Sequence, residues 1–334
     1  RCFQQETDHC PRKRHAHRFW NRHTMVTEKG GFSMKQELRF TFLGGDNRQK
    51  QAISILAQNG FPIYAFGWND IAHEKNVCIF EALDPELLNC NVLMLPVPYG
   101  NSGTIHIPDP YPDVELTSLF PNLRPGTVII FGKEDRAFSE ILDAYPFSCY
   151  DILKEEAFSV RNAILTAEGA VQRAMEQTDM ALYQANVLIL GYGRIGKALS
   201  RMLPGIGSHV TVEARNSGDI VWIEESGCQA VPLDKLDGVL GTQDIIFNTV
   251  PAVLLDRSRL SKIKPECRIL DLASHPGGVD FKAASDLGIH ATQNPGLPGL
   301  VAPKSAAWVI CQSTMDILER HFQDDGTGGG SNCC

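Results

Sequence analysis

The chain has 334 residues, which is long enough for two domains with apolar cores at roughly 100–200 residues per domain. Hydrophobic residues make up 43% of it and charged residues 21%, a composition that excludes a disordered or fibrous protein. The formal net charge of −8 argues against nucleic acid as a partner. No uninterrupted apolar run approaches the roughly 20 residues that cross a bilayer, so we expect no membrane partner either.

Residues 1–35 differ from the rest of the chain in charge. They carry eight Lys or Arg residues, three acidic residues and four of the ten histidines, without apolar periodicity. A secretory signal needs an apolar stretch that this segment lacks. We expect a disordered basic leader here, or upstream codons read before a start at Met25 or Met34, with a basic arm for an acidic partner as an alternative. A zinc site is a weaker alternative, with candidate ligands Cys2, Cys10, His15 and His17.

The ten cysteines include no Cys-x-x-Cys pair. Six of them lie inside apolar runs: Cys78, Cys90, Cys149, Cys228, Cys267 and Cys311. We expect these to be small buried thiols in a reducing compartment, which indicates a cytoplasmic protein. We expect no metal site in the folded part of the chain.

Short apolar runs alternate with helical patterns along the whole chain, which is typical of parallel sheets built from βαβ units. In the first half we expect strands over residues 39–43, 63–66, 92–95 and 128–131, and a helix from the turn at Gly44-Gly45-Asp46 to Asn59. The Pro- and Gly-rich segment Tyr99–Pro112 is expected to be a loop at the carboxyl edge of the sheet.

In the second half, a helix is expected to begin near Thr166, which would cap it, with Glu168 in its first turn. Strands are expected over residues 187–190, 210–213, 245–248, 269–272 and 289–291, and a last helix over 305–322. The fold class is therefore α/β, with two Rossmann-like doubly wound parallel-sheet domains and a C-terminal helix that crosses back to the first domain. The expected divisions are 1–35 (leader), 36–160 (substrate domain), 161–302 (NADP-binding domain), 303–322 (terminal helix) and 323–334 (disordered tail).

The strongest local motif is an apolar strand, Val187–Leu190, that runs into Gly191-Tyr192-Gly193-Arg194-Ile195-Gly196 and a helix. In this Gly-x-Gly-x-x-Gly pattern the first glycine permits a tight turn. The second lets a pyrophosphate approach the backbone, and the third lets helix and strand pack closely. The phosphates would then meet the unpaired N–H groups of the helix N-terminus. The motif predicts dinucleotide binding.

The end of the next strand distinguishes the two nicotinamide cofactors. NAD enzymes usually carry an acid there for the ribose 2′-hydroxyl, whereas this chain has Ala214 followed by Arg215, Asn216 and Ser217. A neutral residue followed by Arg suits a 2′-phosphate, because a guanidinium pairs with it bidentately. We therefore predict NADP, with NAD as the alternative, since a register error of one residue would put Glu213 in this place.

Three further loops follow predicted strands and are expected to face the cofactor and substrate. They are Asn248-Thr249-Val250-Pro251, residues 271–280 and residues 294–304. Each could be an ordinary turn, because Gly and Pro are common turn residues. Because three such loops follow strands of one dinucleotide-binding domain, they favour a binding site for cofactor and substrate at this edge of the sheet.

Taken together, five motifs resemble those of the dipicolinate synthase A-subunit family. They are LGGDNRQ (43–49), Asn162-x-x-x-Thr166-Ala-Glu168-Gly169, the glycine loop, DLASHPGGVDF (271–281) and NPGLPGLVAPKSA (294–306). The likeness covers about residues 37–320, and the last two loops resemble alanine dehydrogenases more distantly. One departure is His275, where close relatives are expected to carry Arg.

The resemblance implies NADP-dependent oxidation of dihydrodipicolinate to pyridine-2,6-dicarboxylate during endospore formation, in the mother-cell cytoplasm. It also implies a flavoprotein-like partner, the dipicolinate synthase B subunit, and flavin would take part only if that partner supplied it. Two alternatives remain: an alanine-dehydrogenase-like enzyme for amino or keto acids, and a non-catalytic nucleotide-binding scaffold.

This chemistry needs a proton acceptor and an anion site. His275 and Asp271 are the candidate catalytic bases, although each could instead be a loop residue that only forms hydrogen bonds. A dicarboxylate substrate needs cations or N–H donors. The candidates for substrate binding are Arg48, Lys304 and the expected helix start at Thr166, Glu168 and Gly169.

Overall fold

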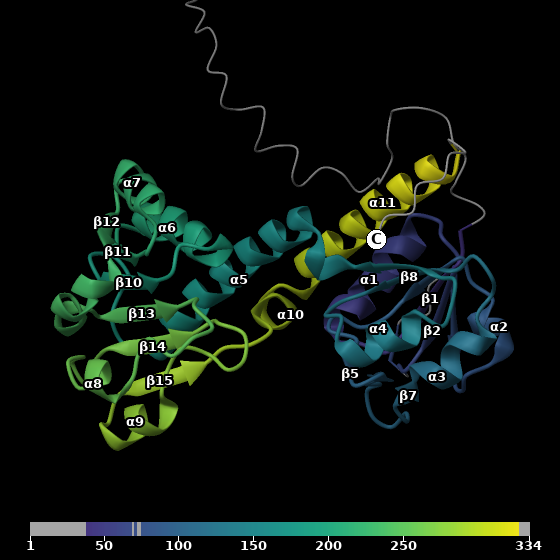
Figure 1. Cartoon of the computed structure of the whole chain (residues 1–334), viewed down its shortest axis with the longest axis horizontal. Coiled ribbons are helices and arrows are strands. Elements are labelled where there is room, and N and C mark those ends of the chain that lie inside the picture. Colours follow the sequence, from purple (N-terminus) through teal and green to yellow (C-terminus); the bar gives the residue numbers. More distant parts are fainter. Residues whose placement is uncertain (1–37, 69, 72–74, 327–334) are drawn as a thin grey trace, which may run out of the picture.

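The computed structural model describes residues 38–68, 70–71 and 75–326, and the expectations for the leader and for the tail after residue 326 lie outside these residues. Two six-stranded parallel sheets stand side by side and are joined by long helices (Figure 1). A small antiparallel sheet of three short strands accompanies the first of them. The predicted class of two doubly wound parallel sheets is confirmed.

The first sheet has the strand order β3-β2-β1-β4-β8-β9. Its strands are β1 (Phe40–Leu43), β2 (Ile63–Phe66), β3 (Val77–Phe80), β4 (Val92–Met94), β8 (Val128–Phe131) and β9 (Ser148–Asp151). Its helices are α1 (Asn47–Gln58), α2 (Pro85–Leu88), α3 (Leu116–Leu119) and α4 (Arg136–Leu142), with 3-10 turns η4 (Phe120–Asn122) and η5 (Ile152–Lys154). The small sheet contains β5 (Gly100–Asn101), β6 (Thr104–Ile105) and β7 (Val114–Glu115), so part of the predicted loop is a hairpin.

The second sheet has the equivalent order β12-β11-β10-β13-β14-β15. Its strands are β10 (Asn186–Leu190), β11 (His209–Glu213), β12 (Gln229–Val231), β13 (Ile245–Asn248), β14 (Arg268–Asp271) and β15 (His290–Gln293). Around them lie α6 (Arg194–Ile206), α7 (Ser217–Glu225), η6 (Leu233–Gly238), η7 (Leu240–Thr242), α8 (Arg257–Leu260) and α9 (Phe281–Asp286). In both sheets the chain runs outward from the centre and then reverses, which is the arrangement of dinucleotide-binding sheets.

Local sequence explains how α1 begins. Gly44 and Gly45 both have positive φ, which lets the chain turn sharply at the end of β1. Asp46 then caps the helix and accepts a hydrogen bond from the backbone N–H of Arg48. The Gln49 side chain accepts from the Asp46 N–H, which completes a capping box.

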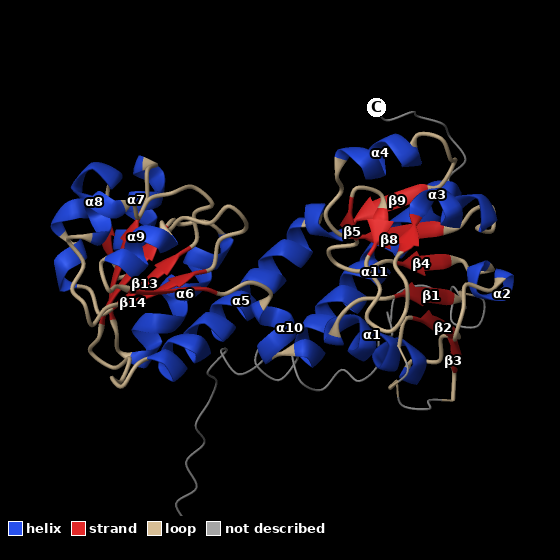
Figure 2. Cartoon of the chain, turned by 90° about the horizontal axis from the view of Figure 1, so that it is seen from below, coloured by secondary structure: helices blue, strands red, loops and turns tan. Residues whose placement is uncertain are grey.

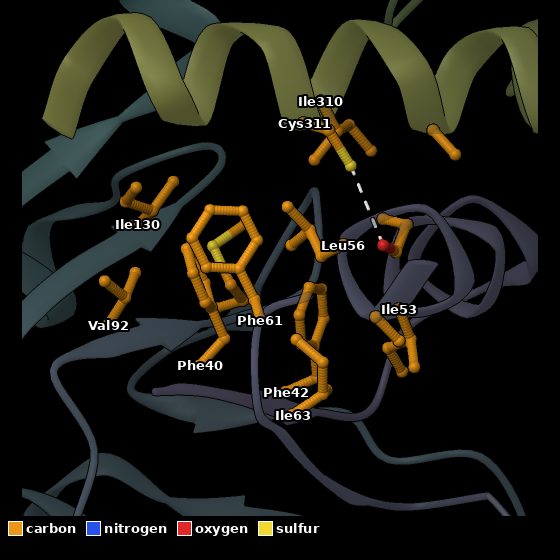
Figure 3. Close-up of a cluster of buried hydrophobic side chains, with 14 of the residues drawn as sticks. Phe40, Phe42, Ile53, Leu56, Phe61, Ile63, Val92, Ile130, Ile310 and Cys311 are labelled. Carbon is orange, nitrogen blue, oxygen red and sulfur yellow. Dashed lines mark hydrogen bonds between the residues drawn. The ribbon is translucent and has the colours of Figure 1, made fainter. Parts of the chain in front are cut away.

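Two connections join the sheets, as Figure 2 shows: the long helix α5 (Glu156–Gln177) and the segment of α10 (Leu297–Val301) and α11 (Pro303–Gly326). Helix α11 lies over α1 and completes the apolar layer on one face of the first sheet. In Figure 3, Ile310 and Cys311 of α11 face Ile53 and Leu56 of α1. The Cys311 Sγ lies 3.7 Å from the Ala52 carbonyl oxygen. The predicted return of the terminal helix is confirmed.

The predicted start of the central helix is wrong. Helix α5 begins at Glu156, ten residues before Thr166, so Thr166 is no cap. Its hydroxyl donates to the Asn162 carbonyl one turn earlier, at 2.8 Å. The predicted domain boundary between residues 160 and 161 consequently falls inside α5. The buried residues Phe158 and Ala163 extend the apolar face of the helix toward its true start.

The six cysteines of the described ranges are free thiols, but not all are buried. Cys78 is exposed and Cys149 is half-buried, contrary to the prediction, because β3 and β9 form the two edges of the first sheet. Within these ranges no group of three or more His, Cys, Asp or Glu side chains is placed to hold a metal ion. No helix found there has the length and apolar character needed to span a membrane.

Candidate functional site

The glycine loop lies at the carboxyl end of β10 and leads into α6. Gly191 has φ +91°, and a Cβ on Gly196 would lie 2.1 Å from the Gly191 carbonyl oxygen. Gly196 therefore permits the close packing of helix and strand that the motif predicts. A Cβ on Gly193, the N-cap of α6, would meet nothing within 4 Å. This open side of the loop leaves room for a diphosphate group next to the first N–H groups of α6.

A pocket of about 240 Å³ lies between this loop and the helix α5. One wall is the start of α6 and the loop after β13, and the other is the start of α5 with η5. The lining residues are Gly193, Arg194, Ile195, Thr249, Leu153, Phe158, Ser159, Asn162, Ala163 and Thr166. Among these, Ser159 and Asn162 were not selected from the sequence as site residues. Asn162 lies one helical turn before Thr166, so the true extent of α5 would have placed both on one face.

Arg194 is already paired at one side of this pocket. Its Nε donates to both carboxylate oxygens of Glu156, each at 3.1 Å, and its Nη2 donates to the same carboxylate. The guanidinium holds the pKa of Glu156 below its ordinary value. Both side chains are more than half exposed, so the pair is open to competition from another anion.

The strand register settles which residue at the end of β11 faces α6. Val212 and Ala214 belong to the apolar layer that also contains residues of α6. Glu213 pairs with Leu190, whose side chain belongs to the layer on the opposite face, so its carboxyl group points away from α6. Glu213 is 1% exposed, its Oε1 has no hydrogen-bond partner, and burial raises its pKa. The predicted neutral position is therefore Ala214.

The residues after β11 remain accessible. Arg215, Asn216 and Ser217 are exposed, and Asn216 caps α7 by accepting from the Gly218 N–H at 2.8 Å. Arg215 thus lies at the start of α7 on the surface.

Asn248 and Asp271 form a buried pair at the ends of β13 and β14, and neither side chain is exposed to solvent. The Asn248 amide donates to Asp271 Oδ1 at 2.7 Å and to the Val250 carbonyl at 3.0 Å. Asp271 also accepts from the backbone N–H groups of Ala273 and Gly278. Both residues hold the neighbouring loops in shape, which corresponds to the orienting role considered for Asp271.

His275 lies in the loop that Asp271 holds. Its side chain is exposed, between the hydrogen-bonded ends of the loop at Ala273 and Gly278. The backbone there is tight, because a Cβ on Gly277 would lie 2.6 Å from Asp271 Oδ2. The two predicted bases therefore lie close together in the sequence of one loop, but Asp271 is buried and His275 is exposed.

Arg48 lies where the first sheet meets the connection back from the second. Its Nε contacts both Asp46 carboxylate oxygens at 3.0 Å, and its Nη2 donates to Asp46 Oδ2 and to the Val97 carbonyl. A Cβ on Gly299 of α10 would lie 3.2 Å from Arg48 Nε. Within the described part of the chain, Arg48 Nη1 has no protein acceptor. Lys304, in the first turn of α11, is exposed.

The helix start predicted near Thr166 as an anion site is not formed by Thr166, Glu168 and Gly169, because these residues lie in the middle of α5. Gly169 packs against α10, where a Cβ would lie 2.8 Å from Val301 Cγ2 and 3.1 Å from Leu297 Cβ. Glu168 is exposed on another side of the helix. A mid-helix position offers no free N–H groups to a carboxylate.

Two family models match adjoining parts of the chain. Residues 39–153 match the N-terminal domain of the dipicolinate synthase A subunit. Residues 158–276 match the NAD-binding domain of D-isomer specific 2-hydroxyacid dehydrogenases. The second match includes the glycine loop, the end of β11 and the Asn248–Asp271 pair.

Among curated proteins, the dipicolinate synthase A subunit of Bacillus subtilis (strain 168) is 30% identical over 293 residues, covering 86% of this chain and 98% of its own. The crystal structure of the dipicolinate synthase A subunit from Bacillus halodurans has a TM-score of 0.78 at 27% identity, covering 85% of this chain and 99% of that one. The Bacillus subtilis structure has a TM-score of 0.76 at 28% identity, covering 86% and 97%.

Proposed function

The chain belongs to the dipicolinate synthase A-subunit family, and from this we propose that it oxidises dihydrodipicolinate to dipicolinate, with NADP as cofactor, in endospore formation. Its dehydrogenase-type NAD-binding domain makes it an oxidoreductase with a nicotinamide cofactor. The observation that carries the proposal is the adjoining pair of matches: an A-subunit N-terminal domain and a dinucleotide-binding domain in one chain. This combination favours the proposed reaction over the alanine-dehydrogenase-like alternative.

The residues around the glycine loop fit a dinucleotide. Gly196 permits the close packing, Gly193 leaves open space, and the first turn of α6 offers unpaired N–H groups. Tyr192 and Ile195 complete the loop, while Thr249, Val250 and Pro251 lie beside it: a Cβ on Gly191 would contact Val250 and Thr249 within 2.8 Å. A bound nicotinamide ring supplies the hydride acceptor. Ala214 and the exposed Arg215 favour a 2′-phosphate over a free 2′-hydroxyl.

Arg48 and Lys304 are the proposed anchors for the two carboxylates of the substrate. Arg48 is oriented by Asp46 and Val97, which leaves Nη1 to pair with an anion. A guanidinium fixed in this way loses little conformational freedom when it binds a carboxylate. Lys304 is exposed in the first turn of α11, shortly after α10, which contacts Arg48.

In the proposed oxidation the ring loses a hydride and a proton and becomes aromatic. His275 is the proposed proton acceptor, because it is exposed and the unprotonated nitrogen of a neutral imidazole can accept a proton. Asp271 is proposed as a positioning residue, since both its oxygens already accept hydrogen bonds that hold the loop of His275.

The family is named for one component of a complex, and we propose the dipicolinate synthase B subunit, in the cytoplasm of the mother cell, to be the partner. The experiment that tests the function follows dipicolinate formation from enzymatically generated dihydrodipicolinate with NADP⁺. It compares this chain alone, the partner alone and the mixture, and includes His275→Gln in each arm that contains this chain.

Product from this chain alone, with a large loss in His275→Gln, is the expected result. Product that requires the mixture but still depends on His275 would place the reaction in a composite site. Product from the partner alone, at a rate this chain does not change, would contradict the proposal and leave this chain as a nucleotide-binding scaffold.

A further inference from the structure

The pocket beside the glycine loop has a wall that is not part of the dinucleotide-binding sheet. This wall is the first half of α5, which supplies Ser159, Asn162 and Thr166 to the lining. Helix α5 also contacts the first sheet and α11. Its residue Phe158 packs in the core of the first sheet. Glu155, the N-cap of α5, accepts a hydrogen bond from Arg320 of α11 at 2.8 Å.

Most polar side chains of the pocket already donate their protons within the protein. The hydroxyl of Ser159 donates to the Leu153 carbonyl at 2.9 Å, and that of Thr249 donates to the Leu190 carbonyl at 2.8 Å. Thr166 likewise donates to the Asn162 carbonyl. These three groups can therefore only accept a hydrogen bond from a ligand without breaking an existing one.

Asn162 differs from these hydroxyls. Its side-chain amide is half-buried, lines the pocket and makes no hydrogen bond with any other residue in the ranges that the structure describes. It offers two N–H donors toward a space whose opposite wall is the first turn of α6. That turn also presents N–H donors, because the first N–H groups of a helix have no intrahelical acceptors.

The free donors on the two sides of the pocket, the Asn162 amide and the first N–H groups of α6, fit a group that has only acceptors and carries negative charge. We propose that Asn162 donates a hydrogen bond to the diphosphate group of the dinucleotide, so that α5 forms the second wall of the diphosphate site. The inference rests on the proposed function, because it assumes that the dinucleotide binds at the glycine loop. Its consequence is that cofactor binding bridges α6 and the helix that is anchored to the first sheet.

The test measures equilibrium binding by the full chain with three probes: NADPH, 2′-phospho-ADP-ribose and adenosine 2′-monophosphate. The first two contain a diphosphate and the third does not. The variants are Asn162→Ala, which removes the donors, and Asn162→Asp, which keeps the shape but places a negative charge at the pocket. Gln172→Ala, an exposed residue on the same helix outside the pocket, is the matched control. Thermal unfolding without ligand checks that each variant is folded.

A hydrogen bond to a charged acceptor predicts that Asn162→Ala weakens both diphosphate-containing probes about tenfold, with a larger loss in Asn162→Asp. Adenosine 2′-monophosphate should bind equally to all variants. Unchanged affinity for 2′-phospho-ADP-ribose in both Asn162 variants would overturn the inference, as would an equal loss of affinity for adenosine 2′-monophosphate. If the wild-type chain bound neither NADPH nor 2′-phospho-ADP-ribose, the proposed function would fail instead, so the two failures are distinguishable.

Discussion

Arg215 is the residue that the proposed preference for NADP depends on. It is exposed directly after Ala214, and the nearest acid, Glu213, points to the other face of the sheet. We expect Arg215→Ala to weaken NADPH binding about tenfold or more, because a charge-assisted hydrogen bond contributes about 1.5–3 kcal/mol. NADH binding should change little. Titration of cofactor fluorescence measures both affinities.

A complementary change at Ala214 provides the control. Ala214→Asp introduces the acid that a ribose 2′-hydroxyl pairs with, and it repels a 2′-phosphate. It should therefore favour NADH over NADPH. Equal losses for both cofactors in Arg215→Ala would contradict the assignment of Arg215 to the 2′-phosphate.

Glu213 should make stability depend on pH. Burial raises its pKa, so the folded state holds its proton at pH values where the unfolded chain, with a pKa of about 4.3, has released it. The carboxyl group therefore lowers the free energy of unfolding progressively as the pH rises from about 4.3 through the folded-state pKa. We expect Glu213→Gln to be more stable than the wild type at pH 7.5, with this advantage lost at pH 4. Urea unfolding at both pH values tests this, and an advantage that is the same at both would count against it.

At the scale of elements, the contact between α5 and α10 depends on the absence of a side chain at Gly169. A Cβ there would lie 2.8 Å from Val301 Cγ2. Alanine is intrinsically better than glycine in a helix by about 1 kcal/mol, but overpacking typically costs about 1–3 kcal/mol. We expect Gly169→Ala to lower the free energy of unfolding by about 1 kcal/mol, measured by chemical denaturation.

Gly205→Ala is the matched control for this change. Gly205 lies in α6, and a Cβ on it would meet nothing within 4 Å, so only the helix propensity changes. This variant should gain about 0.5–1 kcal/mol. If Gly169→Ala were stabilised to the same extent, the α5–α10 contact would not be limited by space at this position.

The strands that the sequence predicts are mainly those buried on both faces. The runs at β1, β2, β8 and β13 are mostly apolar and could be located from local sequence within one residue. The three strands of the large sheets that were missed are β3, β9 and β12, and all three are edge strands. Edge strands are short and partly polar, and pairing with one neighbour defines them more than their own residues do.

In the candidate site, too, only the features that depend on local sequence could be predicted. The glycine loop is recognisable from six consecutive residues: Gly191 has a positive φ and Gly196 packs against the backbone, while Gly193 leaves open space beside the loop. The bond between Asn248 and Asp271 joins two strand ends 23 residues apart, and only the parallel register brings them together. The role of Asn162 depends on where α5 begins and on which loop faces it, which is a tertiary property.

At the scale of the whole molecule, both connections between the sheets are helices that belong to more than one layer. We propose that the chain still consists of two domains, one built on each large sheet, with α5 shared between them. On this proposal the first domain is incomplete without α11, whose buried side chains belong to its core: Ala307, Val309, Ile310, Cys311, Ile317 and Leu318.

A chain that ends at residue 302 should therefore lose the first domain selectively. Removing α11 exposes the apolar surface of α1 and of the sheet residues that pack in the same cluster. We expect the truncated chain to bind a hydrophobic dye and to show no cooperative unfolding of the first domain, while NADPH still binds to the second. Full-length Leu318→Ala should lose about 2–5 kcal/mol, because Leu318 is fully buried. Phe322→Ala on the same helix, at a side chain 36% exposed, should lose much less. A truncated chain whose two domains both unfolded cooperatively would show that α11 only lies on a core that is complete without it.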